Sequence, residues 1–212
     1  MGYIEAIKRP FSDVTKLVIG VVISLIPIVN FIGIGYFLQC AKLTFKKDES
    51  LPEWTDWANL FVTGLVAAII GMIWTIPTML VAWITIGSVL SSASGAMLTG
   101  GMTAFASAIM ASIGTLMIGL VVTLVVGIIF GLLGCAAVLR YAEKGKFAAA
   151  FEFGAIKDVA FKGGFVAALI VSVVYMMVVS VILAFIPLIG GAIATFIAGV
   201  AMWTMLAEAY KG

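Results

Sequence analysis

The sequence predicts an all-α protein, a polytopic transmembrane helical bundle with about four full spans. Hydrophobic residues make up 64% of the chain and charged residues only 10%, whereas soluble domains carry about 25% charged residues. The charges gather in four short stretches, Glu5–Lys16, Lys42–Asp56, Arg140–Lys162 and Glu208–Lys211. The intervals between them are apolar on every face, which favours helices over transmembrane strands of alternating polarity. Each interval is long enough for a helical span of about 20 residues.

The N-terminal part of the chain predicts an interfacial helix followed by a broken apolar segment. Residues 1–16 mix apolar and charged side chains, which suits a short helix in the headgroup layer. Pro27 interrupts the apolar segment 17–41 and predicts a kink or a complete turn. The segment is either a re-entrant hairpin of two half-helices or one kinked span. We favour the hairpin, because it keeps both flanking charged stretches on one side of the membrane.

A second proline stands in a similar context near the end of the chain. Ile26-Pro-Ile-Val and Ile186-Pro-Leu-Ile each precede an apolar run, so Pro187 predicts another helix break. The pairing hints at a weak internal repeat. Four matched positions are equally compatible with chance.

The most informative stretch ends the predicted cytoplasmic loop 42–56 and reads Ser-Leu-Pro-Glu-Trp-Thr-Asp-Trp from Ser50. Its serine and glutamate fit a capping box, and its two tryptophans fit the interfacial aromatic belt. We interpret the stretch as an anchor that starts a membrane helix. The alternative makes Glu53 and Asp56 ligands of a cation or of a lipid headgroup.

Residues 57–139 predict two long membrane helices joined by a turn near residues 91–101, where serine and glycine gather. At about 1.5 Å per residue, each arm exceeds the hydrocarbon core of about 30 Å. The arms must therefore tilt, bend or project, and Pro77 offers a bend in the first. Because the turn carries no charge, we expect lipid or a partner subunit to shield it from water.

The remaining segments are a charged loop at 140–162 and two more membrane helices at 163–207. Phe147 and Phe151 share one helical face in the loop, which predicts an amphipathic segment on the cytoplasmic surface. A docking site for a soluble partner is the alternative. Lys and Arg occur in all four charged stretches, so these loops and both termini are expected on the cytoplasmic side of the cell membrane.

Small residues recur at four-residue spacing in two of the apolar runs. Gly127 is followed by Gly131, and Gly190 is followed by Ala194 and Ala198. In lipid this spacing lets helix backbones approach closely. Packing within one subunit and association between subunits both fit the pattern.

The composition also restricts the chemistry of the chain. Histidine is absent, which removes imidazole-bound metals, Ser-His-Asp hydrolysis and histidine proton relays. No apolar run holds an ionisable residue in its interior, where ion-coupled carriers usually place one. The net charge of +2 gives no nucleic-acid signature. We therefore expect no enzyme, no catalytic, cofactor-binding or metal-binding residue, and no cofactor.

One pattern resembles a known family. Gly35-Tyr36, followed by Leu51-Pro52-x-Trp54-x-Asp56-Trp57-x-x-Leu60-Phe61-x-x-Gly64-Leu65, resembles prokaryotic, mainly archaeal, membrane proteins classed as a domain of unknown function. The resemblance continues at Tyr141–Phe151 and at Ile186-Pro187-x-x-Gly190. It implies a multi-spanning topology and a tryptophan stretch that enters a helix, and it supplies no activity. Gln39 and Lys42 stand where it leads us to expect more arginine.

Together these observations predict a non-enzymatic membrane subunit that scaffolds or shapes the bilayer. Its expected partners are membrane lipids and either copies of itself or other membrane subunits, without nucleic acid. The alternative is a passive channel or transporter for an uncharged or lipid-like solute. Its polar face would come from Ser88, Ser91, Thr99, Thr103, Ser107 and Ser112. A third class, an enzyme acting on lipids, would use the loop carboxylates of Glu53, Asp56, Glu143 and Glu152.

Overall fold

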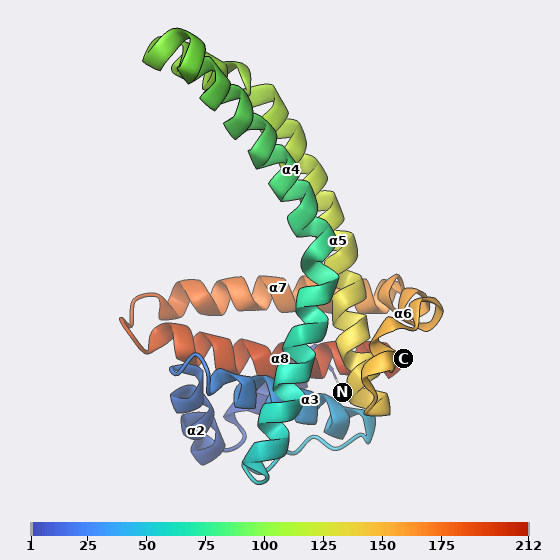
Figure 1. Cartoon of the computed structure of the whole chain (residues 1–212). Coiled ribbons are helices and arrows are strands. Elements are labelled where there is room, and N and C mark those ends of the chain that lie inside the picture. The colour runs from blue at the N-terminus through green and yellow to red at the C-terminus, as the bar shows by residue number, and fades with distance from the viewer. Residues whose placement is uncertain (1, 212) are drawn as a thin grey trace. The chain divides into compact units, whose positions relative to one another are not determined.

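The computed structural model describes residues 2–211, and the all-α prediction is confirmed, since these residues contain no strand. The elements are α1 (Tyr3–Lys8), η1 (Arg9–Phe11), α2 (Val14–Ser24), α3 (Asn30–Phe45), α4 (Trp57–Ala111), α5 (Ile113–Lys144), η2 (Phe147–Phe151), α6 (Phe153–Ala160), α7 (Gly163–Leu183) and α8 (Gly190–Lys211) (Figure 1). The chain forms two compact units, one of Met1–Gly71 with Leu132–Gly212 and one of Met72–Gly131. Four helices, α4, α5, α7 and α8, are long and apolar enough to cross a membrane. The protein is therefore a multi-pass membrane protein.

Helix α8 is the centre of the first unit. It packs against α1, α2, α3 and α7, and 72% of its most apolar 18-residue stretch is buried. Only 11% of the corresponding 18-residue stretch of α7 is buried. An apolar helix surrounded by protein and a neighbour with an uncovered apolar face are the arrangement expected when hydrocarbon, rather than water, is the outer solvent.

Two half-helices surround Pro27, in agreement with the predicted hairpin. Helix α2 has 11 residues and α3 has 16, and 11 residues rise only about 17 Å, which is too short to cross a bilayer. The helical hairpin starts earlier than the predicted Leu17, because the Asp13 carboxylate accepts a hydrogen bond from the Lys16 amide at 3.1 Å and caps α2. The predicted interfacial helix 1–16 is accordingly shorter. Its Met1 lies outside the described residues.

The second proline-containing turn supports the internal repeat. Pro187 lies between α7 and α8, as Pro27 lies between α2 and α3. Tyr36 of α3 contacts Phe196 of α8, with ring centroids 5.8 Å apart. This pair has the same sequence separation as the two prolines. Phe45 and Tyr210, near the C-terminal ends of the same helices, also lie together, with ring centroids 5.6 Å apart. Helices α3 and α8 therefore run side by side in the same direction, with matching positions of the repeat facing each other.

The second unit is an antiparallel helical hairpin formed by parts of α4 and α5. The rings of Trp74 and Phe130 lie 6.3 Å apart, and a side chain added at Gly119 would meet Thr85. In each pair the two residues are equally far from Met102 in the sequence, so the chain reverses its direction at that point. Gly101 has the non-helical angles φ 70° and ψ −158°, a conformation that glycine adopts without a steric penalty.

The predicted turn near residues 91–101 is much shorter in the structure. Residues 91–100 continue α4, and the hydroxyls of Ser91 and Ser94 donate to the carbonyl oxygens of Ser88 and Ser91. These bonds within the helix satisfy the hydroxyls that we read as turn signals. Pro77 likewise lies inside α4 without ending it, whereas Pro27 and Pro187 lie at helix breaks.

Candidate functional site

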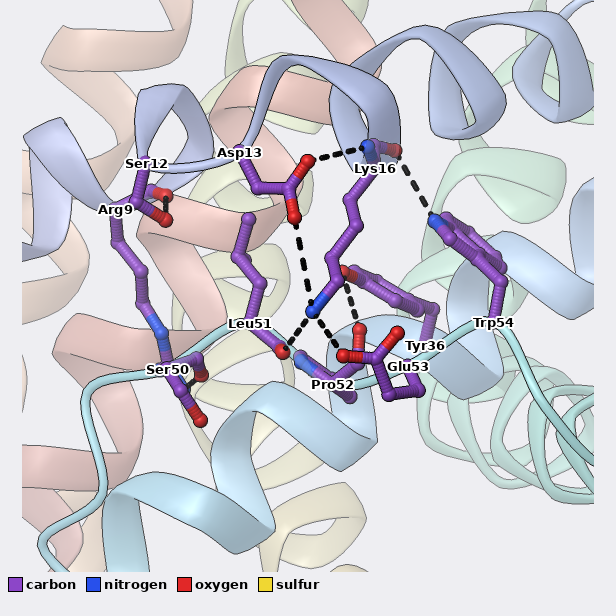
Figure 2. A network of polar contacts seen from close by, with 10 residues as sticks. All are labelled: Arg9, Ser12, Asp13, Lys16, Tyr36, Ser50, Leu51, Pro52, Glu53 and Trp54. Atoms are coloured by element: carbon purple, nitrogen blue, oxygen red, sulfur yellow. Dashed lines mark hydrogen bonds and ion pairs between the residues drawn. The ribbon is translucent and has the colours of Figure 1, made fainter.

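The residues singled out by the family resemblance gather around the loop 51–57, which we call the tryptophan loop. The Trp54 ring stacks on Tyr36, with centroids 3.9 Å apart and planes at 10°, and it also lies against Trp57 at 5.8 Å. Its indole Nε1 donates to the carbonyl oxygen of Lys16 at 3.1 Å (Figure 2). The Tyr36 side chain is fully buried. The loop therefore joins α2 and α3 at the start of α4.

Two further side chains hold the tryptophan loop in place. The Tyr36 hydroxyl donates to the Pro52 carbonyl oxygen at 3.1 Å. The Lys16 ammonium donates to the Leu51 carbonyl oxygen at 2.9 Å and to the Glu53 carboxylate at 2.6 Å (Figure 2). Glu53 is thus the ion-pair partner of a lysine at the rim of the loop, which accounts for its carboxylate without a cation ligand.

The predicted capping box at Ser50 and Glu53 is wrong. Helix α4 begins at Trp57, and the Asp56 carboxylate accepts a hydrogen bond from the Asn59 amide at 3.3 Å, so Asp56 caps the helix. The Ser50 amide instead donates to the Asp48 carboxylate at 2.9 Å. This bond stabilises the ionised form and holds the pKa of Asp48 below its ordinary value.

Two glycines of the same pattern let α3 and α4 touch through their backbones. A Cβ atom on Gly35 would overlap the Leu60 carbonyl oxygen, and one on Gly64 would overlap the Phe31 carbonyl oxygen. Each glycine lies against the other helix, so the contact is reciprocal. Close backbone approach at small residues is a main source of helix association in lipid.

Arg9 is the buried cation of this region, with 3% of its surface exposed. Its Nη1 donates to the Cys40 carbonyl oxygen at 3.2 Å and to the hydroxyls of Thr44 at 2.8 Å and Thr204 at 2.9 Å. These threonines also have the sequence separation of the two prolines, so Arg9 bridges matching positions of the repeat.

The second terminal nitrogen of Arg9 fastens the loop that follows α3. Its Nη2 donates to the carbonyl oxygens of Ser50 at 2.7 Å and Asp48 at 3.3 Å. All five acceptors are neutral oxygens, and the four besides Thr204 lie in the C-terminal part of α3 or in the loop after it, where the helix dipole favours a positive charge. The Nε atom is buried without a hydrogen-bond partner.

The role of Arg9 could not be found from the sequence. We assigned it to the interfacial charges of residues 1–16, where a lysine would serve equally well. Its partners are backbone carbonyls and two threonines far apart in the chain, and neither leaves a recognisable pattern. The one available signal, an arginine directly before Pro10 at the end of α1, is too common to be specific.

One family model matches residues 19–188 and is described as "Protein of unknown function (DUF4013)". The chain belongs to this family. No curated protein and no solved structure matches it. The DUF4013 match includes the tryptophan loop, the α3–α4 crossing and both proline turns.

A second polar cluster in this DUF4013 chain ties the ends of α5 and α8 together. Arg140 pairs with Glu152, its Nε donating at 3.0 Å. Glu143 accepts hydrogen bonds from the Tyr210 hydroxyl at 2.9 Å and from the Lys211 ammonium. The predicted amphipathic segment 140–162 begins with this cluster and continues as η2 and α6.

The predicted packing residues occupy different surroundings. Ala194 and Ala198 are buried in α8, and a Cβ atom at Gly190 would overlap the Leu183 carbonyl oxygen in the tight turn before that helix. Gly127 is close enough to α4 that an added Cβ atom would lie 3.4 Å from Thr78. At Gly131 an added Cβ atom would meet nothing within 4 Å.

The polar side chains of this region are engaged with one another and with backbone groups. Residues 2–211 contain no group of three or more His, Cys, Asp or Glu side chains placed to hold a metal ion. The loop carboxylates Glu53, Glu143 and Glu152 are ion-paired with Lys16, Lys211 and Arg140. The tryptophan loop and Arg9 together fix α2, α3, α4 and α8 to one another.

Proposed function

We propose that the protein is a non-enzymatic membrane subunit that assembles with copies of itself or with other membrane proteins and thereby scaffolds or shapes the bilayer. The observation that carries this proposal is the α4–α5 hairpin. Helix α5 alone has 32 residues, or about 48 Å at 1.5 Å per residue, more than the 40–45 Å of a bilayer with its headgroups. The ten residues of Met102–Ala111 add about 15 Å to the same arm of the hairpin. A bilayer therefore covers the whole arm only if the arm is strongly tilted.

The tip of the hairpin carries an apolar surface that needs a cover. Leu98 is 88% exposed, and Met102 and Met110 are each 67% exposed. No charged residue occurs between Trp57 and Leu139, so the tip carries no charged group that would favour water. Gly87, Gly95 and Gly114 have open space where a side chain would be, which suits close approach by a helix of another subunit.

The hydroxyl groups that would form the polar face of a channel have partners within their own helices. Each donates to a backbone carbonyl oxygen three or four residues earlier, as found for Ser88, Ser91, Thr99, Thr103, Ser107 and Ser112. Hydroxyls bonded in this way are compatible with lipid or with an apolar partner. They supply no argument for a water-filled path, so we favour assembly over transport.

The orientation and the family signature belong to the same proposal. Lys and Arg concentrate in the loops next to the membrane helices, so these loops and both termini lie on the cytoplasmic side of the cell membrane. We take Gly35-Tyr36 and the tryptophan loop as the signature of the family. These residues contact one another and the start of α4, so they form one packing unit.

The mass of the protein in lipid nanodiscs tests the assembly. We expect native mass spectrometry to give multiples of the 22.3 kDa chain or a complex with another membrane protein. Leu98→Glu should reduce this to the single chain, because a carboxylate on the tip opposes burial in an interface. Leu188→Glu is the matched control, since Leu188 is also an almost fully exposed leucine at a helical turn. A single chain for the wild-type protein in both mild detergent and nanodiscs would refute the proposal.

A further inference from the structure

Two hollows in the surface of the first unit share a pair of lysines. One, of about 400 Å³, is lined by Gln39, Lys42, Leu43, Lys46, Ser50, Leu51, Pro52 and Glu53. The other, of about 370 Å³, is lined by Lys42, Phe45, Lys46, Ala142, Glu143, Lys144 and Gly145. Lys42 lies in the last turn of α3 and Lys46 follows directly after the helix, four residues later, which is the spacing of neighbours on one helical face. Both lysines line both hollows.

These two lysines have no carboxylate within ion-pair distance in the part of the chain that the structure describes. The two acidic residues that line the hollows already have ion-pair partners. Glu53 pairs with Lys16, and Glu143 pairs with Lys211. Asp48 is close enough to interact with Lys46 electrostatically, but it accepts its hydrogen bond from the Ser50 amide. Asp48 offsets part of the charge of Lys46, and no ion pair among the described residues offsets that of Lys42, so the pair keeps a net positive charge.

The lysine pair is not needed to cap α3. The carbonyl oxygens of Leu43 and Thr44 accept hydrogen bonds from the amides of residues 46–48, and Arg9 occupies the Cys40 carbonyl oxygen. Burial lowers the pKa of Lys42 from its ordinary value, and the neighbouring Lys46 adds to the shift. Lys42 is half-buried beside the exposed Lys46, and an anion bound between the two ammonium groups would relieve their repulsion.

We infer that Lys42 and Lys46 form a binding site for the phosphate group of an anionic phospholipid. The first hollow is lined by the two lysines, Gln39 and Ser50 together with the apolar Leu43 and Leu51. Glu53 also lines it, with its carboxylate paired with Lys16. This combination of basic and apolar groups matches a phosphate joined to an acyl glycerol, and basic pockets beside membrane helices take such headgroups. The tryptophan loop, whose Leu51 and Pro52 line the same hollow, would stand at the headgroup layer.

The experiment measures lipid binding by the full-length protein in nanodiscs of phosphatidylcholine with titrated phosphatidylglycerol. We expect Lys42→Gln/Lys46→Gln to weaken phosphatidylglycerol binding about 30-fold, since each lysine near a membrane surface contributes about a fivefold factor. The matched control is Lys157→Gln/Lys162→Gln, which removes the same charge from the region of α6. It should change the affinity by less than about twofold, and the thermal melting of all three proteins should agree.

Three results would overturn the inference. An equal loss in both double variants would mean that general surface charge attracts the lipid. Equal binding of phosphatidylcholine and phosphatidylglycerol by the wild-type protein would mean that the pair does not read the anionic headgroup. The third result is that the wild-type protein in lipid-free micelles binds inorganic phosphate, that Lys42→Gln/Lys46→Gln abolishes this binding, and that phosphatidylglycerol is not preferred. It would assign the site to a free anion.

Discussion

Replacing Arg9 by methionine should lower the free energy of unfolding by about 3 kcal/mol, because five oxygen atoms, three of them in buried hydrogen bonds, lose a charged donor at once. Methionine keeps the apolar length of the side chain, so the loss reports the guanidinium. The measurement is equilibrium unfolding in mixed micelles with increasing sodium dodecyl sulfate, followed by circular dichroism.

Two further variants make the Arg9 result specific. Lys8→Met removes the same charge one residue earlier at an exposed position, and it should change the free energy by less than about 0.5 kcal/mol. Arg9→Lys should recover less than half of the loss, because one ammonium cannot reach both threonines and the loop carbonyls. Equal unfolding midpoints for Arg9→Met and Lys8→Met would show that Arg9 does not hold the helices together.

The α3–α4 crossing gives the second large effect. We expect Gly64→Ala and Gly35→Ala each to lower the free energy of unfolding by about 2–3 kcal/mol, because the added methyl group overlaps a backbone carbonyl that cannot move alone. The same unfolding titration measures the loss of free energy in each variant.

Gly71→Ala in the same helix is the control for the crossing, because an added Cβ atom meets nothing within 4 Å there. Alanine is the better helix former, so this variant should be unchanged or more stable by up to about 1 kcal/mol. A Gly64→Ala protein as stable as Gly71→Ala would mean that the two backbones are not in contact.

The all-α class, the long apolar helices and two of the three proline breaks followed from the sequence. Each rests on a property that needs no tertiary structure: the distribution of charge, the length of an apolar run, and the missing amide of Pro27 and Pro187. The residues of the tryptophan loop were also recognised, since Trp54, Asp56 and Trp57 stand out as aromatic and charged residues in an otherwise apolar chain. Their mutual contacts needed the structure.

The failures came from rules that depend on water or on distant partners. Ser91 and Gly95 favour turns in a solvated chain, but within α4 the serine hydroxyl bonds to its own helix. Ser50 and Glu53 have the spacing of a capping box, yet Lys16 from another helix takes the glutamate, and Asp56 becomes the cap. The burial of Arg9 depends on Thr204, far along the chain. No local pattern records such a contact.

The cover over the apolar hairpin tip is tested most directly by cysteine labelling in native membranes. Leu98→Cys, in a chain with Cys135→Ala, is treated with a membrane-impermeant maleimide in broken cells, with Lys47→Cys as the exposed control in the loop after α3. Lipid or a partner subunit over the tip predicts that Cys at position 98 reacts at least tenfold more slowly than Cys at position 47, and that dissociating detergent removes the difference. Equal rates in intact membranes would place the tip in water and contradict assembly through the hairpin.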